Sequence, residues 1–212
     1  MPRPLSKASL RRSTIALAAD HPIFALVYEA YGPPPLWDRE PGFATLLHII
    51  LEQQVSLASA QACFNKLTAR LGHVSPENLL ILSDAELKAV GFSRQKTAYA
   101  RHLAEAVIQS HIDLDGLHKL PDTEVKENLI KLKGVGEWTA DIYLLMVLLR
   151  PDVMPKGDIA LHTAYHKLTG APRPNSDEFL VIAEQWKPYR SVAARLLWHF
   201  YLSERAEKKA KR

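Results

Sequence analysis

A short glycine-rich segment is the first place where this chain could do chemistry. Residues 132–136 (LKGVG) lie between two stretches of helical apolar spacing. Two glycines around one apolar residue let the backbone turn sharply and approach another molecule closely, so we expect a β-carbon to be obstructed at Gly134 and at Gly136. The free N–H groups at the start of the next helix suit a phosphate. The alternative is a plain helix–helix turn, with Val135 plugged between the helices.

A single carboxylate follows in residues 154–162 (MPKGDIALH), where Asp158 precedes the helical pattern Ile159–Leu168. An ionised carboxylate at close range can stabilise a developing positive charge and can orient or deprotonate a water molecule. Aspartate is also a preferred N-cap residue, so capping of the following helix is the structural alternative for Asp158.

The elements that position these groups are predicted to be helices. Apolar residues recur at spacings of three and four, with no convincing strand alternation, which predicts an all-α fold of about ten short helices. We expect one N-terminal helix over Thr14–Tyr31, followed by an extended proline-rich link at residues 31–37 (YGPPPLW). The helices around the glycine-rich segment are expected at Thr123–Leu132 and Glu137–Leu149. Capping patterns predict helix starts at Ser75, Ser83, Ser93, Asp122 and Ser176, and helix ends at Gly72, Gly91 and Arg150.

Composition excludes several classes of protein. Of 212 residues, 47% are hydrophobic and 24% are charged, which is typical of a globular domain. No apolar run reaches the roughly 18 residues of a membrane span, and the N-terminus lacks the apolar core of a secretory signal, so we expect an intracellular protein. The single cysteine, Cys63, excludes an iron–sulfur cluster held by four thiolates. The net charge of +4 is compatible with a polyanionic partner, and the basic end of the chain is either a solvated helix end or a DNA contact.

Taken together, these segments resemble a known family. Residues 132–143 (LKGVGEWTADIY) followed by 155–160 (PKGDIA) resemble the helix-hairpin-helix and Gly/Pro-rich loop with Asp of the HhH-GPD DNA glycosylase superfamily. Three further segments are similar to the 3-methyladenine DNA glycosylase II family. They are residues 49–57 (IILEQQVSL), 91–98 (GFSRQKTA) and 186–193 (WKPYRSVA). The resemblance runs from about Phe43 to Tyr201.

The resemblance implies a monofunctional DNA glycosylase that acts on alkylated purines, such as 3-methyladenine and 7-methylguanine, in duplex DNA. It would hydrolyse the N-glycosidic bond and leave an abasic site, the first step of base excision repair. Asp158 would be the catalytic carboxylate, and it suffices alone because alkylated purines already carry positive charge and leave easily. Bifunctional relatives carry a lysine where Trp138 stands here, so we expect no Schiff base and no lyase activity.

A base pocket is also implied, formed by Trp138 and Trp198. Electron-rich indoles attract a cationic purine by cation–π contact, and the alternative for both residues is core packing. The bacterial pattern of the family has a tyrosine one turn into this helix, where the present chain has Ile142 with Tyr143 beside it. The range of substrates therefore stays open.

The resemblance further implies a set of DNA contacts. Gln54 would fill the gap left by a flipped base, with an ordinary polar helix position as the alternative. Residues 190–191 would hold a phosphate or serve as structural capping. The implied contacts are Gln53, Gln54, Lys133, Gly134, Val135, Gly136, Arg190 and Ser191. No cofactor is required, and the backbone carbonyls of Ile130, Leu132 and Val135 would bind a structural Na⁺ or K⁺.

The expected architecture is two helical lobes with an active-site cleft between them. Residues 36–149 would form the middle lobe and carry the helix-hairpin-helix at about 123–149, and residues 150–212 would form a C-terminal lobe joined by the segment 1–35. We expect a monomer that binds double-stranded DNA, does not contact a membrane, and works in a bacterial cytoplasm or a nucleus. Two rivals remain: a non-catalytic helix-hairpin-helix DNA-binding protein and a helical scaffold.

Overall fold

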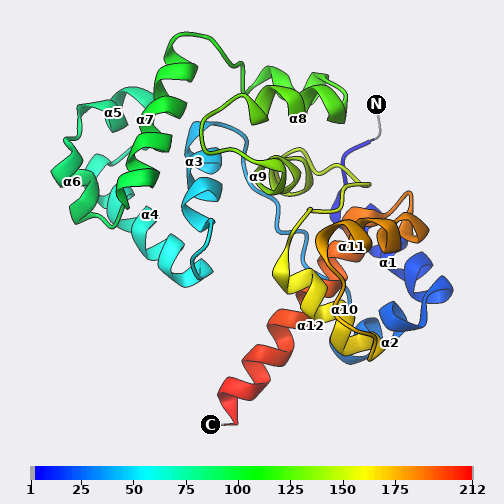
Figure 1. Ribbon diagram of the computed structural model, residues 1–212. Helices are drawn as coiled ribbons and strands as arrows, with labels where there is room; N and C mark the ends of the chain where they lie inside the picture. Colours follow the sequence, from blue (N-terminus) through cyan, green and yellow to red (C-terminus); the bar gives the residue numbers. More distant parts are fainter. Residues whose placement is uncertain (1–2, 212) are drawn as a thin grey trace. The chain divides into compact units, whose positions relative to one another are not determined.

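The structure is a computed structural model, and it describes residues 3–211. Every regular element in that range is helical (Figure 1), as the spacing of apolar residues predicted. The described chain forms two units: unit 1 comprises residues 3–38 with 144–211, and unit 2 comprises residues 39–143. None of the helices described is both long and apolar enough to cross a membrane.

Unit 2 is one continuous stretch of chain. Serine N-caps start four of its helices. The sequence predicted three of them, at Ser75, Ser83 and Ser93, whose Oγ atoms accept backbone N–H bonds. The α5 and α3 helices pack on α7, and their fully buried leucine and isoleucine side chains form the core. The elements of unit 2 are α3 (Phe43–Glu52), α4 (Leu57–Leu71), α5 (Pro76–Ile81), α6 (Asp84–Ala89), α7 (Arg94–Ile108), the 3-10 turn η1 (Gly116–Lys119), α8 (Asp122–Ile130) and α9 (Glu137–Ile142).

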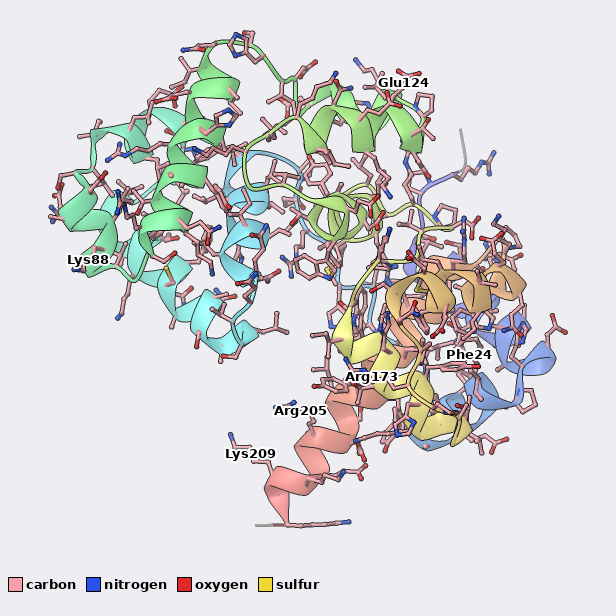
Figure 2. All side chains as sticks on the ribbon, in the orientation of Figure 1. Phe24, Lys88, Glu124, Arg173, Arg205 and Lys209 are labelled. Atoms are coloured by element: carbon pink, nitrogen blue, oxygen red, sulfur yellow. The ribbon has the colours of Figure 1, made fainter. Side chains whose placement is uncertain are left out.

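Unit 1 joins the two ends of the described chain. The long helix α12 packs on α10, α2 and α1. An aromatic cluster fills the space beside α11, with Phe24 (labelled in Figure 2) meeting Trp186 edge to face at 5.2 Å and Phe179 lying 5.9 Å from Trp186. The helices of unit 1 are α1 (Lys7–Asp20), α2 (Pro22–Tyr31), α10 (Ile159–Thr169), α11 (Ser176–Ala183), the 3-10 turn η3 (Glu184–Trp186) and α12 (Arg190–Ala210).

The N-terminal helix differs from the prediction. The region Thr14–Tyr31, expected to be a single helix, belongs to two helices. The first, α1, starts earlier than expected, at Lys7, behind a capping box of Ser6 and Ser9. The break lies at His21, which is extended (φ −131°), and Pro22 takes the first position of α2. A helix tolerates proline only in its first turn, so helix α1 ends before Pro22.

The helix expected over Glu137–Leu149 is also divided. The α-helical part α9 ends at Ile142, and Tyr143–Val147 form a π-helical turn, η2. Leu149 then adopts a positive φ of 53°, and the Arg150 N–H donates to the Leu144 carbonyl at 2.9 Å. Residues 144–149, and likewise residues 36–38, belong to unit 1, whereas the middle lobe was predicted over 36–149.

A buried guanidinium supports this irregular turn. Arg195 of α12 has no exposed surface, and its side chain donates to the carbonyls of Leu145 (2.7 Å), Leu36 (2.9 Å) and Ser191 (3.1 Å). Loss of hydration lowers the pKa of Arg195 to about 10, which leaves it charged at neutral pH. Arg195 therefore fixes the two peptide segments through which the chain leaves and re-enters unit 1.

Candidate active site

The glycine-rich segment of unit 2 is a tight turn between α8 and α9. The Val135 N–H donates to the Leu132 carbonyl at 3.0 Å, and the Val135 side chain is buried. The N-cap of α9 is Gly136, which brings no side chain to cap the first N–H groups of that helix. Lys133 is exposed at the turn. This is the helix-hairpin-helix geometry that the sequence predicted.

The two glycines of the turn differ in what they require. Gly134 has a positive φ of 87°, and a β-carbon there would lie 2.3 Å from two ring carbons of Tyr99. Gly136 has φ −102° with ψ −176°, and a β-carbon there would meet no atom of the protein within 4 Å. The prediction of an obstructed β-carbon is confirmed for Gly134. It is wrong for Gly136 as far as the protein itself is concerned, because that backbone is extended and its surroundings are open.

Helix α7 packs against the hairpin turn through Tyr99 and His102. The Tyr99 ring occupies the space next to the Gly134 Cα, and the Lys133 N–H donates to His102 Nδ1 at 3.3 Å. Sequence reasoning missed both α7 residues. Nothing in the helical pattern of residues 94–108 marks them, since their partners are far along the chain.

A second turn of unit 2, between α3 and α4, is hydrogen-bonded to the hairpin through Gln53. The Gln53 Nε2 donates to the Gly134 carbonyl at 2.8 Å and to the Thr139 Oγ1 at 2.9 Å. Gln54 follows with a positive φ of 59°, and its side chain is exposed. The structure therefore brings Gln53, Gln54 and the hairpin together, but it engages the Gln53 amide nitrogen inside the protein instead of leaving it for DNA.

An ion pair fixes the end of α3 just before these glutamines. The Arg39 guanidinium grips the Glu52 carboxylate with both of its terminal nitrogens, at 3.1 and 2.9 Å, and the Glu52 side chain is buried. His48 lies one turn earlier, with its ring stacked on Phe64 at 4.4 Å, and burial lowers its pKa although the Glu52 charge acts in the opposite direction. The sequence carried no signal of this pair.

Asp158 lies in unit 1 at the start of α10. Its Oδ1 accepts the N–H groups of Ala160 (2.9 Å) and Leu161 (3.1 Å), and the residue is 9% exposed. The structural alternative for Asp158, an N-cap, is thus what the structure contains. Capping does not exclude catalysis, because a carboxylate fixed by two amides has a defined direction.

The imidazole of His162 lies one helical turn beyond Asp158. It is 4% exposed and packs against Phe179, with ring centroids 4.7 Å apart. Burial lowers the pKa of His162, Arg173 lowers it further, and the Asp158 charge raises it.

The two predicted pocket tryptophans belong to different units. Trp138 is half-buried on α9 of unit 2. Trp198 is buried on α12 of unit 1 and meets Trp37 edge to face at 6.4 Å. Next to α9, Tyr143 is wholly buried, and loss of hydration raises the pKa of its phenol to about 12.

Residues 190–191, which sequence left between phosphate binding and capping, are engaged inside unit 1. The Arg190 side chain donates to both carboxylate oxygens of Asp152, at 2.8 and 3.0 Å. The backbone N–H of Arg190 donates to the same carboxylate. Ser191 is fully buried, where its Oγ exchanges hydrogen bonds with Val153, and its N–H donates to the Pro151 carbonyl. Because these donors at the start of α12 are occupied, the contacts favour the structural alternative.

Other parts of the described chain add no metal-binding cluster. Among residues 3–211, no group of three or more His, Cys, Asp or Glu side chains could hold a metal ion. At the basic end of α12, where Figure 2 labels Arg205 and Lys209, Glu204 pairs with Lys167 and Lys208.

The fold and the hairpin define a helix-hairpin-helix protein, and the comparisons identify the class. Residues 47–188 match the HhH-GPD superfamily base excision DNA repair protein family, and the chain belongs to that family. This match contains the hairpin, the α3–α4 turn and Asp158.

Individual relatives agree with this assignment. The chain is 29% identical over 173 residues to DNA-3-methyladenine glycosylase 1 of Schizosaccharomyces pombe, covering 79% of this chain and 76% of the relative. Among solved structures it is similar to a 3-methyladenine DNA glycosylase of the same yeast in complex with abasic DNA (TM-score 0.81, 27% identity, 88% of this chain and 95% of that one). It is also similar to a DNA-3-methyladenine glycosidase of Bacillus halodurans (TM-score 0.76, 31% identity, 97% and 95%).

Proposed function

We propose that this chain is a monofunctional DNA glycosylase that removes alkylated purines, of the 3-methyladenine and 7-methylguanine type, from duplex DNA. The observation that carries the proposal is the family match over residues 47–188, which spans both the hairpin and Asp158. Relatives of similar length are named 3-methyladenine glycosylases. The buried carboxylate of Asp158, which two backbone amides orient, supports catalysis over the non-catalytic alternative, and the Asp158→Asn variant separates the two.

Asp158 performs the chemistry in this proposal. Breaking the N-glycosidic bond leaves positive charge on the sugar, and the Asp158 carboxylate stabilises it and orients or deprotonates the attacking water. The electron pair of the broken bond goes to the purine, whose existing positive charge makes it a good leaving group. No general acid is required for a cationic base, so one carboxylate is sufficient.

The hairpin would hold the DNA backbone. The first N–H groups of α9 lack intrahelical partners, and a helix N-terminus favours a phosphate. On the other side of the turn, the carbonyls of Ile130, Leu132 and Val135 are the kind of oxygen ligand that a hard cation accepts. The Leu132 carbonyl accepts one hydrogen bond, from Val135, and keeps a second lone pair. A Na⁺ or K⁺ ion bound by these oxygens would lend positive charge to phosphate binding.

The remaining predicted residues would act on the base. A damaged purine must leave the stack to be reached, and Trp138 and Trp198 would attract it by cation–π contact, worth ~0.5–2 kcal/mol each. The exposed Gln54 would fill the gap in the duplex. We propose that the protein acts as a monomer, inside the cell, and that it requires no cofactor.

The proposal is tested by release of free bases from DNA treated with a methylating agent. Wild-type protein is expected to release 3-methyladenine or 7-methylguanine, identified by chromatography, while untreated DNA yields nothing. Salt-dependent duplex binding without release would favour the non-catalytic alternative. Absence of duplex binding would favour a helical scaffold.

Strand cleavage distinguishes the monofunctional mechanism from a lyase. Trp138 stands where a lysine would form the Schiff base, so borohydride should trap no covalent protein–DNA adduct, and strands should break only after added alkali. A trapped adduct in appreciable yield would show that another amine attacks the sugar, and the monofunctional assignment would be withdrawn.

A further inference from the structure

The Gln53 side chain connects two turns of unit 2 that are far apart in sequence. Its amide nitrogen donates to the Gly134 carbonyl in the hairpin (2.8 Å) and to the hydroxyl of Thr139 on α9 (2.9 Å). A side-chain amide has two N–H donors, so both are used inside the protein. Thr139 is 1% exposed, which makes this a contact shielded from water at one end.

The residue after Gln53 has a backbone that needs support. Gln54 adopts φ 59°, a left-handed conformation that is unfavourable for a residue with a β-carbon. Such a conformation persists where the surroundings determine it. On the N-terminal side of Gln54, Gln53 is hydrogen-bonded to the hairpin and Glu52 is paired with Arg39. On the C-terminal side, Ser56 is the N-cap of α4.

The hairpin end of the connection has its own support. Tyr99 packs against Gly134, and His102 accepts the Lys133 N–H. Loss of Gln53 would therefore leave the hairpin turn held by α7, while the turn that carries Gln54 would lose the hydrogen bonds of Gln53 to Gly134 and Thr139. The two ends of the contact differ in how much they depend on it.

We propose that Gln53 is a positioning residue that holds Gln54 in register with the hairpin. The hairpin takes the DNA backbone and Gln54 enters the gap left by the flipped base, and Gln53 fixes the distance between the two contacts. Gln53 touches no DNA and acts through Gln54. The inference rests on the proposed glycosylase function and names a residue that it requires.

A double-mutant cycle tests this role. Wild type, Gln53→Ala, Gln54→Ala and the double variant are compared by fluorescence anisotropy on a duplex with a tetrahydrofuran abasic analogue and on the same duplex unmodified. Gln53→Ala is expected to weaken binding to the abasic duplex about 5- to 30-fold, within the range of coupled neighbouring residues. Binding to the unmodified duplex should change less than about twofold, since that contact is made by the hairpin. In the Gln54→Ala background, Gln53→Ala should cost nothing further.

Gln53→Glu is the matched control, because it keeps the size of the side chain but places an acceptor against the Gly134 carbonyl. It should reproduce the loss seen with Gln53→Ala. Losses that add in the double variant would mean that Gln53 contacts DNA itself, which overturns the inference. Equal losses on both duplexes, together with a lower thermal midpoint, would reduce Gln53 to a stabilising residue and also overturn it.

Base release by wild type is measured on the same preparation. Release with an additive cycle overturns only the positioning role of Gln53. Absence of release overturns the proposed function, and the positioning role is lost with it.

Discussion

Replacement of Asp158 by asparagine is expected to reduce base release at least about a hundredfold in single-turnover assays on methylated DNA. The amide keeps the shape of the side chain but has no negative charge with which to stabilise the sugar cation. Asparagine is as good an N-cap as aspartate, so the bonds from the Ala160 and Leu161 N–H groups persist and the thermal midpoint should hardly move. Duplex affinity should stay similar or rise, because a negative charge near phosphates is removed.

Asp158→Ala separates the cap from the chemistry. It removes both the charge and the acceptor oxygen, so α10 should lose about 1 kcal/mol of stability, equivalent to about 2–4 °C in thermal midpoint for a chain of this size. Both variants should be inactive, but only Asp158→Ala should be less stable. Near wild-type release by Asp158→Asn would show that Asp158 is a helix cap and nothing more.

Gly134→Ala is expected to have the largest effect on stability at the hairpin. The new β-carbon would lie 2.3 Å from the Tyr99 ring, and the φ of 87° disfavours any residue with a β-carbon. The conformation costs about 1–2 kcal/mol and the overpacking about 1–3 kcal/mol. The sum of about 2–5 kcal/mol predicts a thermal midpoint lower by roughly 4–20 °C. Duplex affinity should fall on damaged and undamaged DNA alike, because a displaced hairpin loses a contact to the backbone.

Two variants serve as controls for Gly134→Ala. Gly136→Ala meets no protein atom within 4 Å, so its midpoint should be nearly that of wild type. Any loss of duplex affinity in that variant reports the approach of a phosphate, with a flat sequence preference and an unchanged salt slope. Tyr99→Ala combined with Gly134→Ala should recover only the part of the loss caused by crowding. An unchanged midpoint in Gly134→Ala would contradict the tight packing of the turn.

Local chemistry explains which helices could be predicted from the sequence. Ser75, Ser83 and Ser93 cap helices that begin where expected, because a cap depends on residues within one turn of chain. The break at His21 was missed although Pro22 marks it, since the apolar spacing on either side outweighed the proline. The π turn after Ile142 was not predictable, because the Leu145 carbonyl within it accepts a hydrogen bond from Arg195 of a distant helix.

In the candidate site, too, features that depend on local residues were predictable, and contacts between distant residues were not. The tight turn at Gly134 and the position of Asp158 ahead of a helix were visible in the sequence, since glycine and aspartate carry conformational preferences of their own. The contacts of Gln53, Tyr99 and Thr139 with the hairpin join residues that are far apart in the chain. No periodicity encodes such pairs, so Gln53 was assigned to DNA when its amide is used by the protein.

The interleaved order of the two units has a consequence for synthesis on the ribosome. Unit 2 is a single run of chain, residues 39–143, so all of its helices emerge in succession and can pack as soon as α9 is made. Unit 1 cannot close at that stage, because α1 and α2 wait for α12, and the Leu5 N–H waits for the Leu149 carbonyl. Arg195 arrives after both segments it holds, Leu36 and Leu145. Helix α12 is therefore translated after α1 and α2 and completes their packing.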